Sequence, residues 1–223
     1  MLFGRIKNKM DEKVLDILKE KIQCYFKEDG SHGFDHTQRV YNLAVELAKE
    51  KKDIDLGVIK MAALLHDIAR MREVEGEDIC HAEEGSKMAE DLLKEANVPE
   101  EKISKVVDAI KVHRYSKGLE PESKEAEILQ DADRLDALGA ICIARVFGYG
   151  GMKGRPLYRA DMPPKKVYIG EDSTTAINHF YEKIFKIKPE TFKTKVAQTI
   201  ARERYKFIEE FVERFIKEWE GKL

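Results

Sequence analysis

The stretch Met61-Ala-Ala-Leu-Leu-His66-Asp67-Ile-Ala-Arg70 places an imidazole and a carboxylate at the end of a strongly apolar run. Burying such groups on an apolar helix face costs free energy unless they are paired or bind a metal ion. A single buried pair of this kind is more often a hydrogen-bonded part of a core than a metal site. The interpretation therefore depends on whether other segments supply further ligands.

Two other segments do so. His36 lies four residues before Val40 and is predicted to share the inward face of a helix with it. Asp131 and Asp133 stand in Asp-Ala-Asp-Arg-Leu-Asp, at the start of another apolar helical pattern. Two imidazoles and two carboxylates would form a mixed nitrogen and oxygen site, suited to Mn, Fe, Co, Ni, Zn or Mg.

Helical geometry alone leaves the choice between these two aspartates open. Residues two apart point about 200° from each other around a helix, so only one of them can face a given ion. Ile128 and Leu135 flank Asp131 at three and four residues, which favours Asp131 on the buried face. A stripe facing a metal should instead carry polar supporting groups, and Asp136 would supply one beside Asp133.

Helical periodicity runs through almost the whole chain, and no segment shows sustained alternation of apolar and polar residues. We predict an all-α protein, a bundle of about eight helices forming a single domain over residues 1–223. An irregular loop is expected at 148–172, with C-terminal helices over 173–219 packed on the domain. The predicted helices cover residues 11–27, 35–51, 55–70, 79–97, 99–114, 122–147, 173–187 and 191–219.

Composition excludes several classes of protein. The 40 basic and 42 acidic side chains leave a formal charge of -2, so a nucleic acid is not expected as a partner. No apolar run approaches the roughly 18–20 residues of a membrane span, and no apolar signal core follows Met1, so we expect a cytoplasmic protein. Three widely spaced cysteines fit neither a disulfide framework nor a thiolate zinc site.

The order His36, His66-Asp67 and Asp133 resembles the H…HD…D signature of the HD superfamily of metal-dependent phosphohydrolases. The resemblance covers nearly the whole chain, and the C-terminal region is similar to a bacterial and archaeal subgroup called predicted HD hydrolases. It implies one divalent ion, Mn, Fe, Ni, Co or Mg, held by His36, His66, Asp67 and Asp133. It therefore selects Asp133 as the fourth ligand, and it implies hydrolysis of a phosphate ester or anhydride.

The same resemblance implies roles for three further residues. His81 and His113 correspond to regions that complete a dinuclear site in some members and contact phosphate or act as a general acid in others. The sequence lacks a GYP signature and a paired His-His, which favours the phosphate role. Arg134 stands where many members carry a basic residue that contacts phosphate. His179 is predicted to be structural.

The irregular loop is basic and contains aromatic residues. Lys153, Arg155 and Arg159 could bind phosphates, and Tyr149 or Tyr158 could stack on a base, which predicts a small phosphorylated substrate, with a nucleotide favoured. On composition alone, a solvated charged loop explains this segment equally well. We predict that the loop faces the metal.

Two other functions are compatible with these residues. Some HD proteins activate oxygen at a di-iron centre, which here would require His81 and His113 as additional iron ligands. A non-catalytic ligand-binding module that retains a metal is a further alternative, although the complete ligand set argues against it. The absence of an HExxH motif excludes a zincin protease.

Overall fold

The computed structural model describes residues 2–26, 33–114, 117–166 and 173–222. These residues form α-helices and short 3₁₀ helices, with no strand among them, which confirms the all-α prediction. The chain divides into two compact units, residues 1–133 and 134–223, and each is described separately below. No single helix within the described ranges is long and apolar enough to cross a membrane. Only the pair formed by residues 124–136 and 140–152, bent by 60°, reaches that length and composition.

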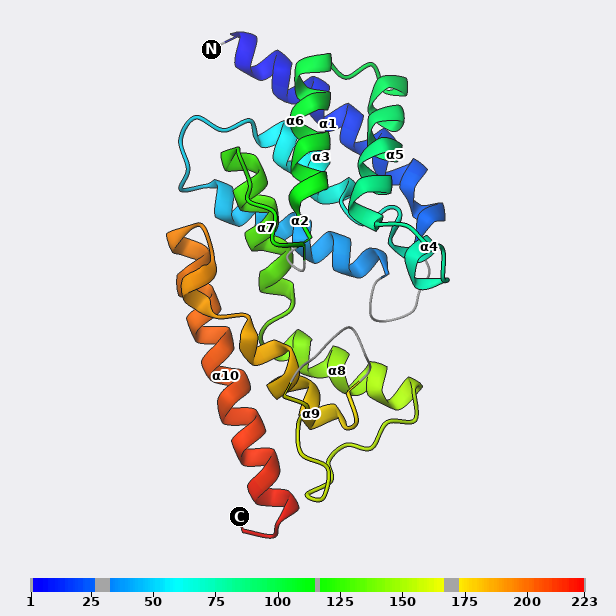
Figure 1. Ribbon diagram of the computed structural model, residues 1–223. Coiled ribbons are helices and arrows are strands. Elements are labelled where there is room, and N and C mark those ends of the chain that lie inside the picture. The colour runs from blue at the N-terminus through cyan, green and yellow to red at the C-terminus, as the bar shows by residue number, and fades with distance from the viewer. Residues whose placement is uncertain (1, 27–32, 115–116, 167–172, 223) are drawn as a thin grey trace. The chain divides into compact units, whose positions relative to one another are not determined.

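The first unit is built around one buried helix, α3 (Leu56–Leu65), in which eight residues are buried. Asp55 caps this helix by accepting hydrogen bonds from the backbone nitrogens of Gly57 and Val58. Around α3 pack α1 (Leu2–Ile22), α2 (Phe34–Ala48), α5 (His81–Glu95) and α6 (Glu100–Val112) (Figure 1). Since α3 contacts all four, side chains that leave its ends can meet residues from several helices.

Two shorter elements complete this unit. The helix α4 (Arg70–Val74) follows α3 after a turn and contacts α5. The helix α7 (Lys124–Asp136) begins in the first unit and crosses the boundary between the units at Asp133 and Arg134. Together α3 and α4 replace the continuous helix predicted over 55–70.

The second unit contains α8 (Ala140–Met152), α9 (Ala176–Glu182) and α10 (Lys195–Trp219), with short 3₁₀ helices η3 (Ile184–Lys186) and η4 (Pro189–Thr191). Its core is aromatic. The ring centroids of Phe147, Phe180 and Phe211 lie 5.9 to 6.4 Å apart, and Phe180 is fully buried.

Several other predicted boundaries were wrong, among them that of the helix predicted over 11–27, which runs from Leu2 to Ile22. The helix predicted over 122–147 is broken between Asp136 and Ala140, because Gly139 adopts a φ of 85° that favours glycine and ends the helical ladder. The loop predicted from 148 begins only after Met152, and its end at 167–172 lies outside the described residues. The last helix starts at Lys195, since the Thr194 side chain accepts from the backbone nitrogen of Ala197.

Candidate metal centre

The His66-Asp67 pair lies immediately after α3, in a tight turn rather than in a helix. The backbone nitrogen of Ile68 donates to the carbonyl of Leu65 at 3.4 Å, and that of Arg70 donates to the carbonyl of Asp67 at 2.9 Å. Adjacent residues of a continuous helix point about 100° apart, whereas this turn aims both side chains at one point. His66 is fully buried and Asp67 is 5% exposed.

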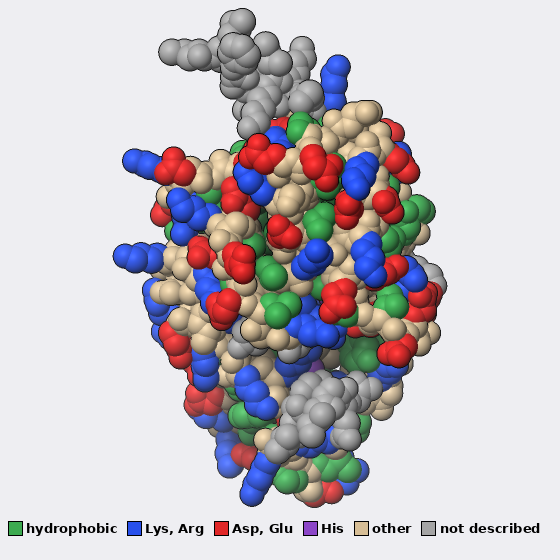
Figure 2. Space-filling model, turned by 45° about the horizontal axis from the view of Figure 1, so that its top comes forward, with side chains coloured by type: hydrophobic (Ala, Val, Ile, Leu, Met, Phe, Trp, Pro, Cys, Tyr) green, Lys and Arg blue, Asp and Glu red, His purple; other side chains and the backbone are tan. Residues whose placement is uncertain are grey.

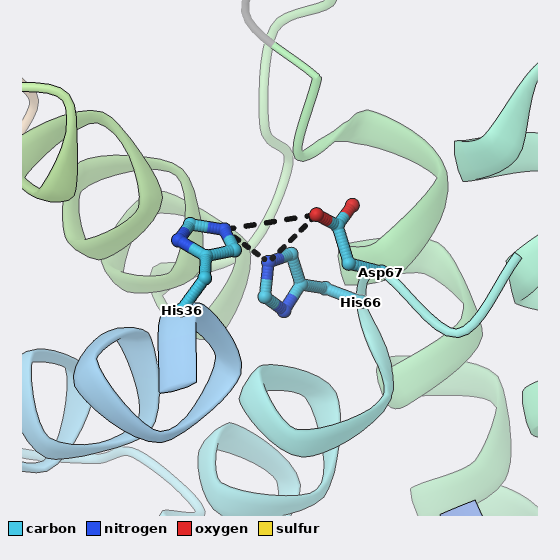
Figure 3. A group of neighbouring side chains, drawn as sticks. All are labelled: His36, His66 and Asp67. Atoms are coloured by element: carbon cyan, nitrogen blue, oxygen red, sulfur yellow. Dashed lines mark hydrogen bonds and ion pairs between the residues drawn. The ribbon is translucent and has the colours of Figure 1, made fainter. Parts of the chain in front are cut away.

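Four side chains converge on that point. The Nε2 atom of His36, from the first turn of α2, lies 3.3 Å from Nε2 of His66 and 3.6 Å from Oδ2 of Asp67 (Figure 3). Oδ1 of Asp133 lies 3.3 Å from the same His36 nitrogen and 4.0 Å from that of His66. All four predicted ligands are therefore brought together within the first unit.

These separations fit a single bound ion. Ligand atoms about 2.1 Å from a metal and 90–110° apart lie roughly 3.0–3.4 Å from one another. The donor atoms of the four side chains lie 3.3 to 4.0 Å apart, so the shorter distances fall within this range and the longer ones slightly exceed it. Small rotations of the side chains would bring all four atoms to bonding distance from one ion. Two imidazole nitrogens and two carboxylate oxygens match the borderline preference of first-row divalent ions.

A second group shares Asp67 with the first. Its other oxygen, Oδ1, lies 3.4 Å from Nε2 of His81 and 3.6 Å from Nε2 of His113. His81 is the first residue of α5 and His113 follows the last turn of α6, and both are buried. Asp67, His81 and His113 thus form another cluster that could hold a metal ion, with Asp67 able to bridge the two groups.

Hydrogen bonds to the other ring nitrogen orient three of these imidazoles. The Nδ1 atom of His66 contacts the carbonyl of Ala63 at 2.8 Å, and that of His113 contacts the carbonyl of Ile110 at 2.6 Å. His81 differs, because its Nδ1 contacts a carboxylate oxygen of Glu73 at 2.7 Å. Since these acceptors require a proton on Nδ1, we assign the Nε2 lone pair of each ring to the cluster.

The electrostatics favour the protonation states that bind metals at His66, His81, Asp67 and Asp133. Burial lowers the pKa of His66, and it lowers the pKa of His81 to about 4, so both are neutral at neutral pH. Burial alone would raise the pKa of Asp67 and Asp133, but the neighbouring imidazoles outweigh it. They hold the pKa of Asp67 well below its usual range and lower that of Asp133 to about 2. At His113, by contrast, burial would lower the pKa but the contact with Asp67 outweighs it and raises the pKa.

Three residues that support His81 were missed in the sequence. Glu73 on α4 accepts a hydrogen bond from Arg70 at 2.7 Å through Oε2 and another from Arg114 at 2.6 Å through Oε1. The NH1 nitrogen of Arg70 also lies 3.0 Å from Nδ1 of His81. The residues around Glu73 in the sequence do not indicate that it supports a histidine. The only weak indication is that Glu73 follows the His66-Asp67 pair closely along the chain.

Arg134 is buried within the second unit. Its guanidinium donates to the backbone carbonyl of Thr191 at 3.0 Å and to the hydroxyl of the same residue, and it lies 4.3 Å from the centre of the Phe192 ring. Asp136 is also buried and accepts a hydrogen bond from Arg145 at 2.9 Å. A phosphate contact for Arg134 therefore stays a prediction.

The basic residues of the loop lie in the second unit. Lys153 and Arg155 both lie near the Tyr149 ring, at 5.7 and 5.5 Å from its centre, whereas Arg159 pairs with the exposed Asp161 at 2.7 Å.

The backbone of this loop is attached to α9. The backbone nitrogen of Ala176 donates to the carbonyl of Pro156, the side chain of Asn178 donates to the carbonyl of Met162, and Glu182 accepts from the nitrogen of Lys165. His179 on the same helix contacts the hydroxyl of Ser173 at 3.1 Å. The described part of the loop is thus an ordered segment.

Comparison with known proteins relates the chain to a single family. Residues 33–138 match the HD domain model. The uncharacterized protein YpgQ of Bacillus subtilis is 32% identical over 198 residues, which cover 87% of each chain. A solved HD-superfamily hydrolase from Bacillus thuringiensis is 35% identical with a TM-score of 0.73, covering 96% of this chain and 98% of its own. YpgQ in complex with ADP gives a TM-score of 0.71 at 28% identity, covering 94% and 96%.

Proposed function

We propose that this chain, which belongs to the HD superfamily of metal-dependent phosphohydrolases, hydrolyses a phosphate ester or anhydride of a nucleotide. The observation that carries the proposal is the convergence of His36, His66, Asp67 and Asp133, with donor atoms 3.3 to 4.0 Å apart. A relative of similar fold, YpgQ, is described in complex with ADP, which supports a nucleotide as the ligand.

The four side chains would hold one divalent ion, Mn, Fe, Ni, Co or Mg. Such an ion, when bound, lowers the pKa of a coordinated water and neutralises phosphate oxygens. Asp67 and Asp133 supply two negative charges and the histidines supply neutral donors, so the set compensates a doubly charged cation. The buried carbonyl of Ala63 keeps the His66 ring oriented for this purpose.

His81 and His113 would line the reacting centre. Both rings present Nε2 to Asp67 and are buried, so they can exchange a proton with a reacting group or contact a phosphate close to the ion. Arg134, Lys153, Arg155 and Arg159 complete the proposed set of cationic groups that bind the phosphates of the substrate.

The second cluster supports an alternative function, a di-iron oxygenase, because Asp67, His81 and His113 could hold a further ion. The oxygenase would differ from the proposed phosphohydrolase in the number of metal ions per chain and in the spectroscopic signature of the iron. Protein purified without oxygen and loaded with iron would show two iron ions per chain and the signature of a bridged pair. One ion per chain would exclude the oxygenase.

A phosphate and pyrophosphate release screen tests the proposed function. Nucleoside mono-, di- and triphosphates are each incubated with Mn, Mg, Ni, Co or Fe. We expect metal-dependent release that Asp67→Asn abolishes, while Asp108→Asn, an exposed carboxylate on α6, leaves it unchanged. Absence of release from every nucleotide with every metal would contradict the proposal.

A further inference from the structure

One side of the His81 ring offers two incompatible contacts. Nδ1 lies 2.7 Å from Oε2 of Glu73, an atom that can only accept a hydrogen bond when the carboxylate is ionised. The same Nδ1 lies 3.0 Å from NH1 of Arg70, an atom that can only donate. A neutral imidazole cannot satisfy both, because Nδ1 either carries a proton or presents a lone pair.

The arrangement of the two arginines decides this competition. Arg70 already donates to Oε2 of Glu73 at 2.7 Å, and Arg114 donates to Oε1 at 2.6 Å. Two guanidiniums therefore hold the carboxylate in place, and its shorter, charge-assisted contact with the ring outweighs the longer one from Arg70. The proton is then on Nδ1, and the Nε2 lone pair faces Asp67 at 3.4 Å.

We propose that Glu73 is a positioning residue that sets the tautomer of His81, so that Nε2 faces the metal centre as a lone-pair donor. His81 then acts there by accepting a proton or coordinating a cation, and does not donate a hydrogen bond to phosphate from Nε2. Without Glu73, the nearest charged neighbour of Nδ1 is the guanidinium of Arg70. The proton would then move to Nε2, where it would point at Asp67.

This inference deepens the proposed function, since it assigns the state in which one residue of that site operates. Its test is independent of catalysis. Metal-free protein with 15N-labelled histidine is studied by long-range 15N–1H correlation near pH 7.5, which distinguishes a protonated ring nitrogen from one with a lone pair. His81 is assigned from the signals lost in His81→Gln.

We expect Nδ1 of His81 to be protonated in the wild type and Nε2 to be protonated in Glu73→Ala. The matched control is Glu77→Ala, which removes an acidic partner of Arg72 close to α4. Because Glu77 pairs with Arg72 and not with the ring, this control should keep the wild-type tautomer. Arg70→Met should also keep it, since Glu73 remains.

A second readout uses metal binding. A supporting carboxylate behind a ligating histidine changes metal affinity by about 10–100-fold. Zn²⁺ titration of Glu73→Ala should therefore show weaker binding at the Asp67, His81 and His113 cluster than titration of Glu77→Ala, and Glu73→Asp should recover part of the loss.

Glu73→Gln, which keeps the size of the side chain, replaces Glu73→Ala if the latter does not fold, and we expect it to give a mixture of the two tautomers. The inference would be overturned if His81 carried its proton only on Nδ1 in every folded Glu73 variant. It would also be overturned if the wild-type ring were protonated on Nε2. Neither result would bear on nucleotide hydrolysis. Conversely, failure of the nucleotide screen would leave the tautomer result intact.

Discussion

His36 and Asp133 face each other across the first unit, with Nε2 of the histidine 3.3 Å from Oδ1 of the aspartate. They come from the first turn of α2 and the last turn of α7. His66 and Asp67, from the turn after α3, approach the same point from another direction. The site therefore depends on the positions of α2 and α7 relative to the end of α3, because a shift of either helix would move a ligand away from the other three.

The first prediction separates Asp133 from Asp131. Asp133→Ala should remove bound metal and lower activity by at least about 100-fold, because the ion loses a ligand and a compensating charge. Asp131→Ala should retain the metal and lose activity only in part. Elemental analysis of the purified proteins measures the metal. The opposite pattern, with metal lost in Asp131→Ala and kept in Asp133→Ala, would show that the wrong carboxylate was assigned.

For three of the four proposed metal ligands, His36, His66 and Asp67, the signal in the sequence is local. His66-Asp67 ends an apolar run, and His36 shares a helical face with Val40, which the structure buries. Residue pattern alone left Asp131 and Asp133 open, and only the family resemblance chose between them. In the structure, Asp131 is fully buried, as that pattern suggested, while Asp133 lies 3.3 Å from His36.

Other features could not be predicted, because they depend on tertiary contacts or on one backbone angle. The break at Gly139 requires a positive φ, which a glycine inside an apolar helical pattern does not reveal. Glu73 supports His81 only because α4, the start of α5 and the end of α6 meet in space. The sequence of α4, Arg70–Val74, does not by itself indicate this tertiary contact.

The second prediction concerns a buried charge that holds three helices together. Lys102 on α6 is 6% exposed and lies 2.7 Å from Asp11 on α1 and 3.4 Å from Asp55 at the start of α3. Lys102→Met keeps the volume of the side chain but removes the cation that lies beside the carboxylates of Asp11 and Asp55. We expect a loss of about 3 kcal/mol in the free energy of unfolding, measured with urea.

The matched control for Lys102 is Lys105, on the same helix. It pairs with Glu101 at 2.8 Å, but its side chain is 45% exposed. Lys105→Met should cost less than about 1 kcal/mol, because exposed pairs contribute little. Equal losses for the two variants would show that the buried cluster contributes no more than a surface pair.

The third prediction concerns alkaline pH. Burial raises the pKa of the Cys142 thiol to about 12 from an ordinary value near 9. Between these values the unfolded chain loses the proton while the folded chain keeps it, so stability falls as pH rises. At pH 10.5 this group should cost about 2 kcal/mol of unfolding free energy, which follows from 1.36 kcal/mol per pKa unit.

Comparison of the wild type with Cys142→Ala isolates that contribution. The stability difference between the two proteins should shift by this amount between pH 8 and pH 10.5. In the folded protein at pH 8, iodoacetamide should modify the exposed Cys24 and spare Cys142. Rapid modification of Cys142 without unfolding would contradict the buried, protonated state.

The last prediction concerns the basic loop. Lys and Arg are mixed with Asp and Glu over the face seen in Figure 2, so charge alone marks no extended anion-binding surface there. The loop has a more specific arrangement. Lys153 and Arg155 lie near the Tyr149 ring, and hydrogen bonds with α9 order the backbone that follows them. An ordered pair of cations beside an aromatic ring suits a phosphate and a base.

Arg155→Glu and Lys153→Glu should each raise KM for a phosphorylated substrate by about 10-fold or more and leave metal affinity unchanged, because a repelled phosphate weakens substrate binding without touching the ligands. Steady-state kinetics and metal titration on the same preparations measure the two quantities. Lys206→Glu, a reversal at an exposed position of α10, is the matched control and should leave KM unchanged. Unchanged kinetics at Lys153, Arg155 and Arg159 alike would show that the loop is a solvated surface segment, since three charge reversals beside a bound phosphate could not all be silent.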